Sequence, residues 1–372
     1  MDRSRRRTMR SVVHALVVIA LVSTSGVLTQ EIQRKEEDQR APLRSATWLS
    51  GAQERRASAG RYRFERLTAP ARTIVRDSDG SIVAAFTDGA RTAVLTGPSR
   101  TIAGQCIARA PITTDSWVRL LPRTWTRHSE KSPWFQGWFS KHLGDTRADV
   151  IGAALEYANK PSAQQPRVAW PWPGVDRPGA GALCFSPAWS AVAKIPRPRP
   201  RHSDFNDFLG VSWRFADGVV RQSASPGPRA LDSAGLVRLV LGYRNRYPLN
   251  STDRSSGAAL PRTADAMAAR GPGVRILPPK PARDAGPARP SAGQAFIGKM
   301  QPGDLAFFKS DRKNGRRSGS GVGCVAIYLG LDIEGNPRFL SSRAETGPFL
   351  GGLSHAEGIR FRGRPLRAVV RL

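Results

Sequence analysis

Apolar positions in the second half of the chain recur first at helical spacing and then in short extended runs. After a Pro-Gly-Pro break at 226–228, the apolar residues that follow at helical intervals are Leu236, Val237, Val240 and Leu241. This spacing predicts a buried helix with Ser233 in its first turn. Apolar runs at 305–308, 323–330 and 338–343 predict strands, because turn residues or glycines flank them. One buried helix against several strands indicates an α+β domain.

The first half begins with a different pattern. Apolar runs at 73–75 and 82–86 flank the turn sequence Asp77-Ser78-Asp79-Gly80, and a third run follows at 91–95. Short runs separated by such turns predict a small β-meander. We expect it to have a structural role.

Aromatic residues crowd the region from Trp117 to Tyr157. Trp134, Trp138 and His142 fall four apart, so they share one face of a predicted helix, and 149–159 predicts another helix. Such a belt can stack on sugar rings or bases. We favour the alternative, in which it forms the core of a helical subdomain.

Composition divides the chain into five parts. They are a signal peptide or signal anchor at 1–29, a charged linker at 30–66, the N-terminal region with the meander and the Trp-rich helices at 67–160, a Pro/Arg-rich connector at 161–202, and the α+β domain at 203–372. Pro-rich segments form stiff, extended connectors. A further Pro/Gly/Arg insertion at 270–290 predicts a long surface loop.

The N-terminus predicts export. Several arginines precede an apolar run at 12–22, and small residues follow it at 23–26. This is the layout of a secretory signal peptide, and an uncleaved helix that tethers the chain to the membrane is the alternative. We expect an extracellular or envelope-associated protein.

Charge adds a possible class of partner. The chain has 58 Lys and Arg against 29 Asp and Glu, a formal net charge of +29. Such a balance favours anionic polymers, although a GC-rich genome produces the same Arg-rich composition. No nucleic-acid-binding motif occurs, so no specific nucleic acid is expected.

The cysteines leave two possibilities open. In an exported chain, Cys106 and Cys184 can form a disulfide and leave Cys324 unpaired, or all three can be free thiols. No pair of them has the spacing of metal ligands, so the sequence predicts no metal site and no cofactor.

Three motifs carry a family resemblance. They are Asp232-Ser233-Ala234-Gly235, Pro302-Gly303-Asp304-Leu305 and Cys324-Val325-Ala326-Ile327-Tyr328-Leu329-Gly330. In this order they resemble the NlpC-type cell-wall peptidases, secreted bacterial enzymes of the papain-like superfamily. The motifs of that family read Asp-Cys-Ser-Gly, Pro-Gly-Asp-Leu and His-Val-Gly-Ile-Tyr-Leu-Gly. The resemblance covers residues 203–372 and implies a papain-like domain in which the helix packs on an antiparallel sheet.

The resemblance also implies site positions. Ser233 takes the place of the nucleophilic cysteine, Cys324 that of the general-base histidine, and Ser341 lies near the place of the third, orienting residue. The implied neighbours of the site or groove are Asp232, Ala234, Asp304 and Tyr328. A thiol is a poor base for a hydroxyl, and losing the nucleophile or the base costs on the order of a millionfold in turnover. The resemblance therefore predicts a pseudoenzyme that binds peptidoglycan stem peptides or a partner cell-wall enzyme.

Other interpretations of these residues stay open. A base from outside the aligned positions, His202 or His355, makes Ser233 the nucleophile of an active cell-wall hydrolase. Cys324 is a further candidate nucleophile, although its place on an apolar strand is typical of a packed thiol. Asp and Ser are also favoured helix caps, so the first motif suits a purely structural role. In a third function, the basic surface binds an anionic polymer at the envelope and the groove is vestigial.

Overall fold

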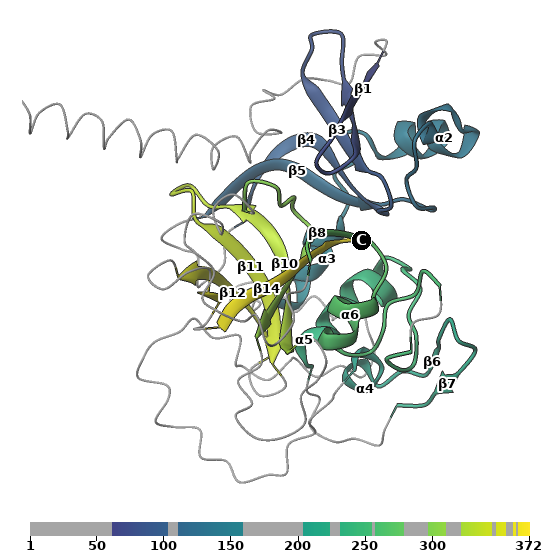
Figure 1. Cartoon of the computed structure of the whole chain (residues 1–372), viewed down its shortest axis with the longest axis vertical. Coiled ribbons are helices and arrows are strands. Elements are labelled where there is room, and N and C mark those ends of the chain that lie inside the picture. The colour runs from purple at the N-terminus through teal and green to yellow at the C-terminus, as the bar shows by residue number, and fades with distance from the viewer. Residues whose placement is uncertain are drawn as a thin grey trace, which may run out of the picture. The chain divides into compact units, whose positions relative to one another are not determined.

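The computed structural model describes ten stretches of the chain (Figure 1). They are residues 62–102, 111–158, 204–223, 231–254, 257–278, 297–309, 321–343, 347–354, 360–361 and 364–372, with side chains described outside 343–364. All of them belong to one compact unit, Ala46–Leu372. The predicted export segment, the connector at 161–202, Cys106, Cys184, His202 and His355 lie outside the described residues.

The first half forms an antiparallel sheet in which each strand pairs with the next along the chain. Its strands are β1 (Arg63–Leu67), β2 (Arg72–Arg76), β3 (Ile82–Thr87), β4 (Thr92–Ile102) and β5 (Ile112–Leu120). The predicted meander is therefore confirmed, and two strands that the pattern did not reveal flank it. Gly80 has φ +79° in the turn between β2 and β3, where Asp77 accepts hydrogen bonds from the backbone of Asp79 and Ser81. The sheet also begins inside the range expected to be linker, because β1 starts at Arg63.

The aromatic belt packs inside the first half. Helix η1 (Ser129–Lys131) leads into α2 (Pro133–His142), and α3 is Val150–Ala158. The aromatic side chains of α2 join the inner face of the sheet in one core, whose aromatic members are Phe86, Trp125, Phe135, Trp138 and Phe139. Trp138 and His142 lie on the same face of α2 with ring centroids 4.8 Å apart. The prediction that the belt forms part of a hydrophobic core is confirmed, but the helical subdomain is wrong, because sheet residues such as Ala84 and Leu95 belong to the same core as α2.

The second half begins with short elements around one longer helix. They are α4 (Phe205–Leu209), the hairpin β6 (Trp213–Arg214) and β7 (Val220–Arg221), α5 (Ser233–Val237), the π-helix η3 (Arg238–Arg244) and α6 (Ala264–Arg270). The helix predicted at 233 therefore exists and continues to Arg244. Its apolar residues Leu236, Val237, Val240 and Leu241 are at most 1 % exposed, as their spacing predicts.

An antiparallel sheet of seven strands forms the rest of the domain. Its order is β13-β12-β11-β10-β9-β14-β8. The bounds are β8 Val274–Leu277, β9 Leu305–Lys309, β10 Val322–Leu331, β11 Pro337–Arg343, β12 Gly347–Ser354, β13 Arg360–Phe361 and β14 Arg364–Arg371. Because β13 pairs with both β12 and β14, strands β9 to β14 close into a ring. The three predicted strands are β9, β10 and β11.

Two stretches for which the sequence predicted no strand each contain one. The insertion at 270–290 includes β8, which pairs with β14, so that part of the surface-loop prediction is wrong. The glycine-rich stretch at 347–352 belongs to β12 and pairs with β11. In both cases tertiary pairing overrides the local preference of glycine and proline for turns.

Helices α5 and α6 pack on β10 and share one core with it, and the domain is α+β as predicted (Figure 1). Strand β14 also joins this domain to the first sheet. The Arg371 guanidinium donates to Thr87 at 2.9 Å as well as to Asp304, and the backbone oxygen of Leu372 accepts from Arg91 at 2.7 Å. The two sheets therefore share polar contacts around the end of β14.

Candidate functional site

Ser233 stands at the first position of α5, directly after the N-cap. Asp232 is the cap, and its carboxylate accepts a hydrogen bond from the backbone nitrogen of Gly235 at 2.6 Å. A capping carboxylate satisfies a free N–H group and complements the helix dipole. The predicted cap is therefore present, but Asp232 supplies it, and the Ser233 hydroxyl is left for another partner.

A buried charge network holds this end of the helix. Arg262 bridges two carboxylates, with contacts of 2.8 Å to Asp232 and 3.4 Å to Asp204. Asp204 in turn pairs with Arg238, which is 0 % exposed and also donates to the carbonyl oxygens of Leu260 and Pro261. Burial lowers the pKa of Arg262, but the two carboxylates outweigh this effect and leave that pKa raised. Two cations and two anions thus compensate one another.

The structure brings Ser233, Cys324 and Ser341 together around one backbone residue, Val325. The Ser233 Oγ accepts from the Val325 nitrogen at 3.2 Å, and the Ser341 hydroxyl donates to the Val325 oxygen at 2.7 Å. The Cys324 Sγ lies 3.3 Å from the Ser341 Oγ. Residues from α5, β10 and β11, more than a hundred positions apart at the extremes, therefore meet at one point.

The sheet leaves a gap at this point. Pairing between β10 and β11 runs from Leu331 back to Ile327 and stops there, whereas Val325 still pairs with Phe307 of β9. The polar groups of Val325 that face β11 would be unsatisfied in the interior, which costs about 1–3 kcal/mol each. Two serine hydroxyls take the place of the missing backbone partners. Helix α5, which packs on both β10 and β11, thus begins where the two strands separate.

The chemistry available to these side chains is limited. Ser233 is 8 % exposed, Cys324 5 % and Ser341 0 %. A serine attacks only when a base within hydrogen-bond reach takes its proton, and the described contacts of Ser233 include an N–H donor but no such base. The described histidines, His128 and His142, belong to the first half of the chain. The described part of the site therefore has the geometry of a hydrogen-bonded junction.

The remaining predicted neighbours separate into two groups. Ala234 follows Ser233 on α5 and is buried with it. Asp304 instead binds Arg371 with both carboxylate oxygens at 2.8 Å, and the Tyr328 ring packs on Phe339 at 5.2 Å. Tyr328 stands four residues from Cys324 along β10, about 13 Å in an extended strand. Asp304 is therefore the ion-pair partner of Arg371, and Tyr328 has a packing role at a distance from Ser233, Cys324 and Ser341.

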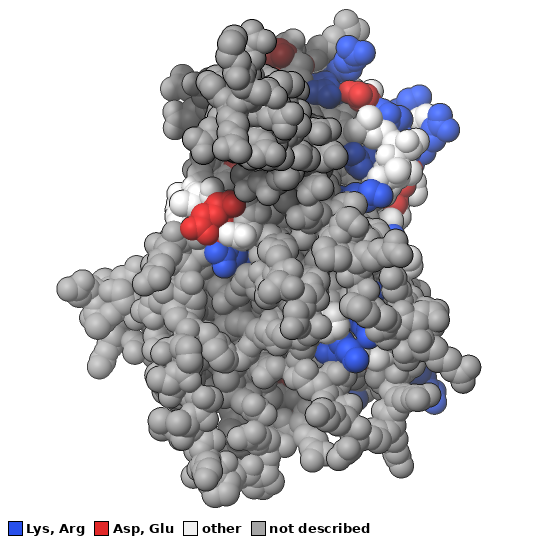
Figure 2. Space-filling view, turned by 60° about the vertical axis from the view of Figure 1, so that its left-hand side comes forward, with Lys and Arg blue, Asp and Glu red and all other residues white. Residues whose placement is uncertain are grey.

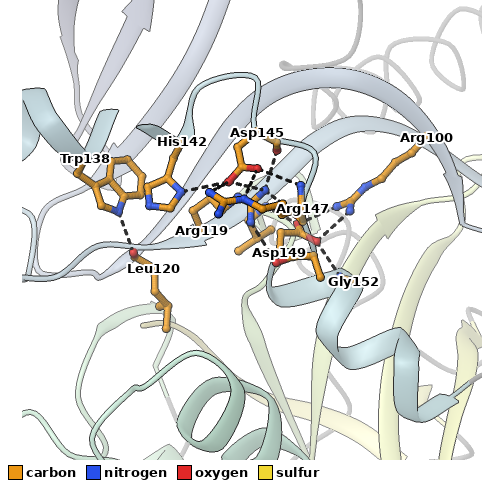
Figure 3. Close-up of polar contacts among 11 residues, drawn as sticks. Arg100, Arg119, Leu120, Trp138, His142, Asp145, Arg147, Asp149 and Gly152 are labelled. Atoms are coloured by element: carbon orange, nitrogen blue, oxygen red, sulfur yellow. Dashed lines mark hydrogen bonds and ion pairs between the residues drawn. The ribbon is translucent and has the colours of Figure 1, made fainter. Parts of the chain in front are cut away.

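A second polar cluster, which the sequence did not predict, lies between α2 and α3 (Figure 3). Arg119 donates to the carbonyl oxygens of Asp145, Arg147 and Ala148, and thereby fixes the loop between the helices. The Arg100 guanidinium donates two hydrogen bonds to the Asp149 carboxylate, which also accepts a hydrogen bond from the backbone N–H of Val118. The only signal in the sequence was the position of Asp149 at the start of a predicted helix, where a capping aspartate is typical.

His142 borders this cluster. Its Nδ1 is 3.6 Å from a carboxylate oxygen of Asp145, and its ring lies against the Trp138 ring with an angle of 45° between the two planes. Burial, and after it the charge of Arg119, lowers the pKa of His142. Hydrogen bonds from Arg147 hold the pKa of Asp145 well below its usual range. The described contacts of His142 are with a carboxylate and an aromatic ring, so we interpret the cluster as a structural one that holds the loop between α2 and α3 in place.

Among the residues that the structure describes, no group of histidine, cysteine and carboxylate side chains is arranged to hold a metal ion. Within the same part of the chain, no helix has the length and hydropathy needed to span a membrane. Comparisons with protein-family models, with curated proteins and with solved structures give no match to this chain.

Proposed function

We propose that the chain is an exported, NlpC-like envelope protein that binds peptidoglycan stem peptides or a partner hydrolase without cutting. The convergence of Ser233, Cys324 and Ser341 supports this proposal. These three residues come from the helix start, the strand start and the next strand, as the family resemblance implies. The papain-like assignment is part of the same proposal, and the order of helix and antiparallel strands supports it.

The chemistry of the junction argues for binding without cleavage. The Ser233 hydroxyl accepts from a backbone N–H, and the hydroxyl of Ser341 donates to a backbone carbonyl. Both serines therefore stabilise the fold at the place where a peptidase of this family holds its reacting groups. Gly323, next to Cys324 on β10, is exposed and gives a peptide a surface to lie on beside the junction.

Binding to purified peptidoglycan and to isolated stem peptides tests the proposal. The full chain should sediment with peptidoglycan and leave the muropeptide pattern unchanged. Gly323→Trp adds bulk beside the junction and should weaken binding at least tenfold. Ile333→Trp is the matched control, because Ile333 is 63 % exposed at the far end of the β10–β11 hairpin. If both variants bind peptidoglycan equally well, the peptide does not bind beside the junction, and the proposed site is wrong.

An active hydrolase gives a different result in the same assay. If the chain cleaves peptidoglycan and Ser233→Ala abolishes cleavage, a base from outside the described residues serves Ser233 and the pseudoenzyme assignment is wrong. The double variant Ser233→Cys with Cys324→His tests the scaffold. If the double variant folds, it should cleave peptides, whereas neither single variant should. A folded double variant without any cleavage activity would count against the papain-like assignment.

An anionic polymer is the second candidate partner, favoured by the formal charge of +29. On the face drawn in Figure 2, described Lys and Arg side chains gather at the upper right with acidic side chains among them. Such mixing weakens the local field that a basic stripe would produce. Binding to a soluble polyanion should fall steeply with salt, whereas binding of a stem peptide at the junction should not.

A further inference from the structure

The β6–β7 hairpin exposes adjacent apolar side chains. Three large apolar residues are exposed in the described part of the chain: Val219 at 43 %, Val220 at 49 % and Ile333 at 63 %. Single exposed apolar residues are ordinary, but neighbouring ones with a polar rim mark contact surfaces. Val219 and Val220 are consecutive, and every residue from Ala216 to Gln222 is exposed. In Figure 1 the hairpin lies beside α4 at the edge of the view.

The hairpin is fastened to the domain, so its exposed tip is a fixed feature. Phe215 is buried, and its backbone nitrogen donates to the Val219 oxygen at 2.8 Å. The Ala216 nitrogen donates to Leu249 at 2.8 Å. The carboxylate of Asp217 accepts both the backbone N–H and the hydroxyl of Ser251, at 2.9 and 2.7 Å. The acidic group of the turn is thus engaged with the body of the domain.

Two arginines flank the valines. Strand register places Arg214 directly opposite Val220, so the two side chains share one face of the hairpin. Arg221 follows Val220, and its guanidinium lies 5.9 Å from the Phe215 ring. Both arginines are exposed, and no described acidic side chain forms an ion pair with either of them.

We propose that this hairpin docks the protein on an anionic membrane surface. Val219 and Val220 would enter the boundary between headgroups and acyl chains, while Arg214 and Arg221 would contact lipid phosphates. A soluble polyanion would satisfy the arginines but leave the valines in water, and a bilayer satisfies both. The formal charge of +29 adds long-range attraction to the same surface. This inference does not depend on the peptide-binding function.

Vesicle sedimentation of the full chain tests the inference. The probe is a vesicle of equal parts phosphatidylglycerol and phosphatidylcholine, with pure phosphatidylcholine as the neutral comparison. Val219→Asp with Val220→Asp should lower partitioning roughly tenfold, because it removes the apolar contact and adds repelled charge. Arg214→Gln with Arg221→Gln should lower it by a similar factor on anionic vesicles alone. Ile333→Asp, the matched control, should change it less than twofold.

A milder variant separates docking from misfolding. Val219→Thr with Val220→Thr keeps the shape of the side chains and should weaken binding several-fold while the melting temperature stays unchanged. Unchanged binding by both valine variants would overturn the inference and leave attraction by general charge. Equal loss with Ile333→Asp would overturn it as well, because the effect would then not belong to the hairpin.

Discussion

Removal of the Asp204 carboxylate should destabilise the protein more than removal of any surface carboxylate. Asp204 and Arg238 are 3 % and 0 % exposed, with a shortest N–O contact of 2.9 Å. The variant Asp204→Asn keeps the size of the side chain but leaves the Arg238 cation without its closest counter-charge. Arg262 also touches Asp204, so a second cation loses part of its compensation.

The magnitude follows from the burial of the pair. Breaking a buried ion pair on one side costs about 3–5 kcal/mol, because a charge stays in a medium that solvates it poorly. Two features limit the loss here. The carbonyl oxygens of Leu260 and Pro261 still accept from Arg238, and Asp232 still pairs with Arg262. We therefore expect Asp204→Asn to lower the free energy of unfolding by about 3 kcal/mol. This is a large part of the total free energy of unfolding of a typical protein, roughly 5–15 kcal/mol.

Equilibrium unfolding in urea measures this loss. The control is Asp88→Asn, because its partner Arg66 and Asp88 have side chains that are 37 % and 26 % exposed, and such pairs contribute at most about 1 kcal/mol. The double variant Asp204→Leu with Arg238→Met removes both charges and should recover most of the lost stability. A loss below about 1 kcal/mol for Asp204→Asn, or no recovery in the double variant, would refute the argument.

Three further measurements test other parts of the structure. Burial raises the pKa of Tyr247 to about 12, against roughly 10 in the unfolded chain. The unfolded chain therefore loses this proton first as the pH rises, and the free energy of unfolding should fall by roughly 2–3 kcal/mol between pH 10 and pH 12. Tyr247→Phe should not show this fall. Gly303 has φ +91° and a Cβ there would lie 2.7 Å from a valine methyl, so Gly303→Ala should cost several kcal/mol in thermal unfolding. Gly80→Ala, at φ +79° with open space, should cost only about 1 kcal/mol. His142 should titrate below 6.5 by NMR, so protonation at lower pH opposes folding; a midpoint above 6.5 would contradict its buried position.

The spacing of apolar residues was enough to predict the elements whose buried face is encoded within one short segment of sequence. The spacing of Leu236 and Leu241 located the buried helix, and the apolar run at 323–330 located β10. Strands β8 and β12 were missed, because glycine, proline and arginine dominate their neighbourhoods and only pairing with β14 and β11 makes them extended. Closure of the ring by β13 depends on two pairings of a strand of two residues, which no window of sequence contains.

The candidate site was predictable in position but not in its bonding. The motif order placed Ser233, Cys324 and Ser341 on elements that do meet. The role of Val325 was not visible, because a backbone group that needs a partner has no signature in the sequence. The Arg238–Asp204 pair was also missed, since its partners are 34 residues apart and both residue types are usually found on surfaces.

The bonding at Val325 gives a physical reason for serine at both positions. A hydroxyl is a better hydrogen-bond partner than a thiol, and the gap between β10 and β11 requires one acceptor for the Val325 N–H and one donor for its carbonyl. Ser233 supplies the acceptor and Ser341 supplies the donor. If the chain has the NlpC-like origin that we propose, Ser233 stands where relatives have a reactive cysteine, and its hydroxyl forms a stronger hydrogen bond between α5 and the sheet than a thiol would. The hydrogen bonds to Val325 then engage both hydroxyls, and the contribution of these bonds to stability is enough to maintain the geometry of the site.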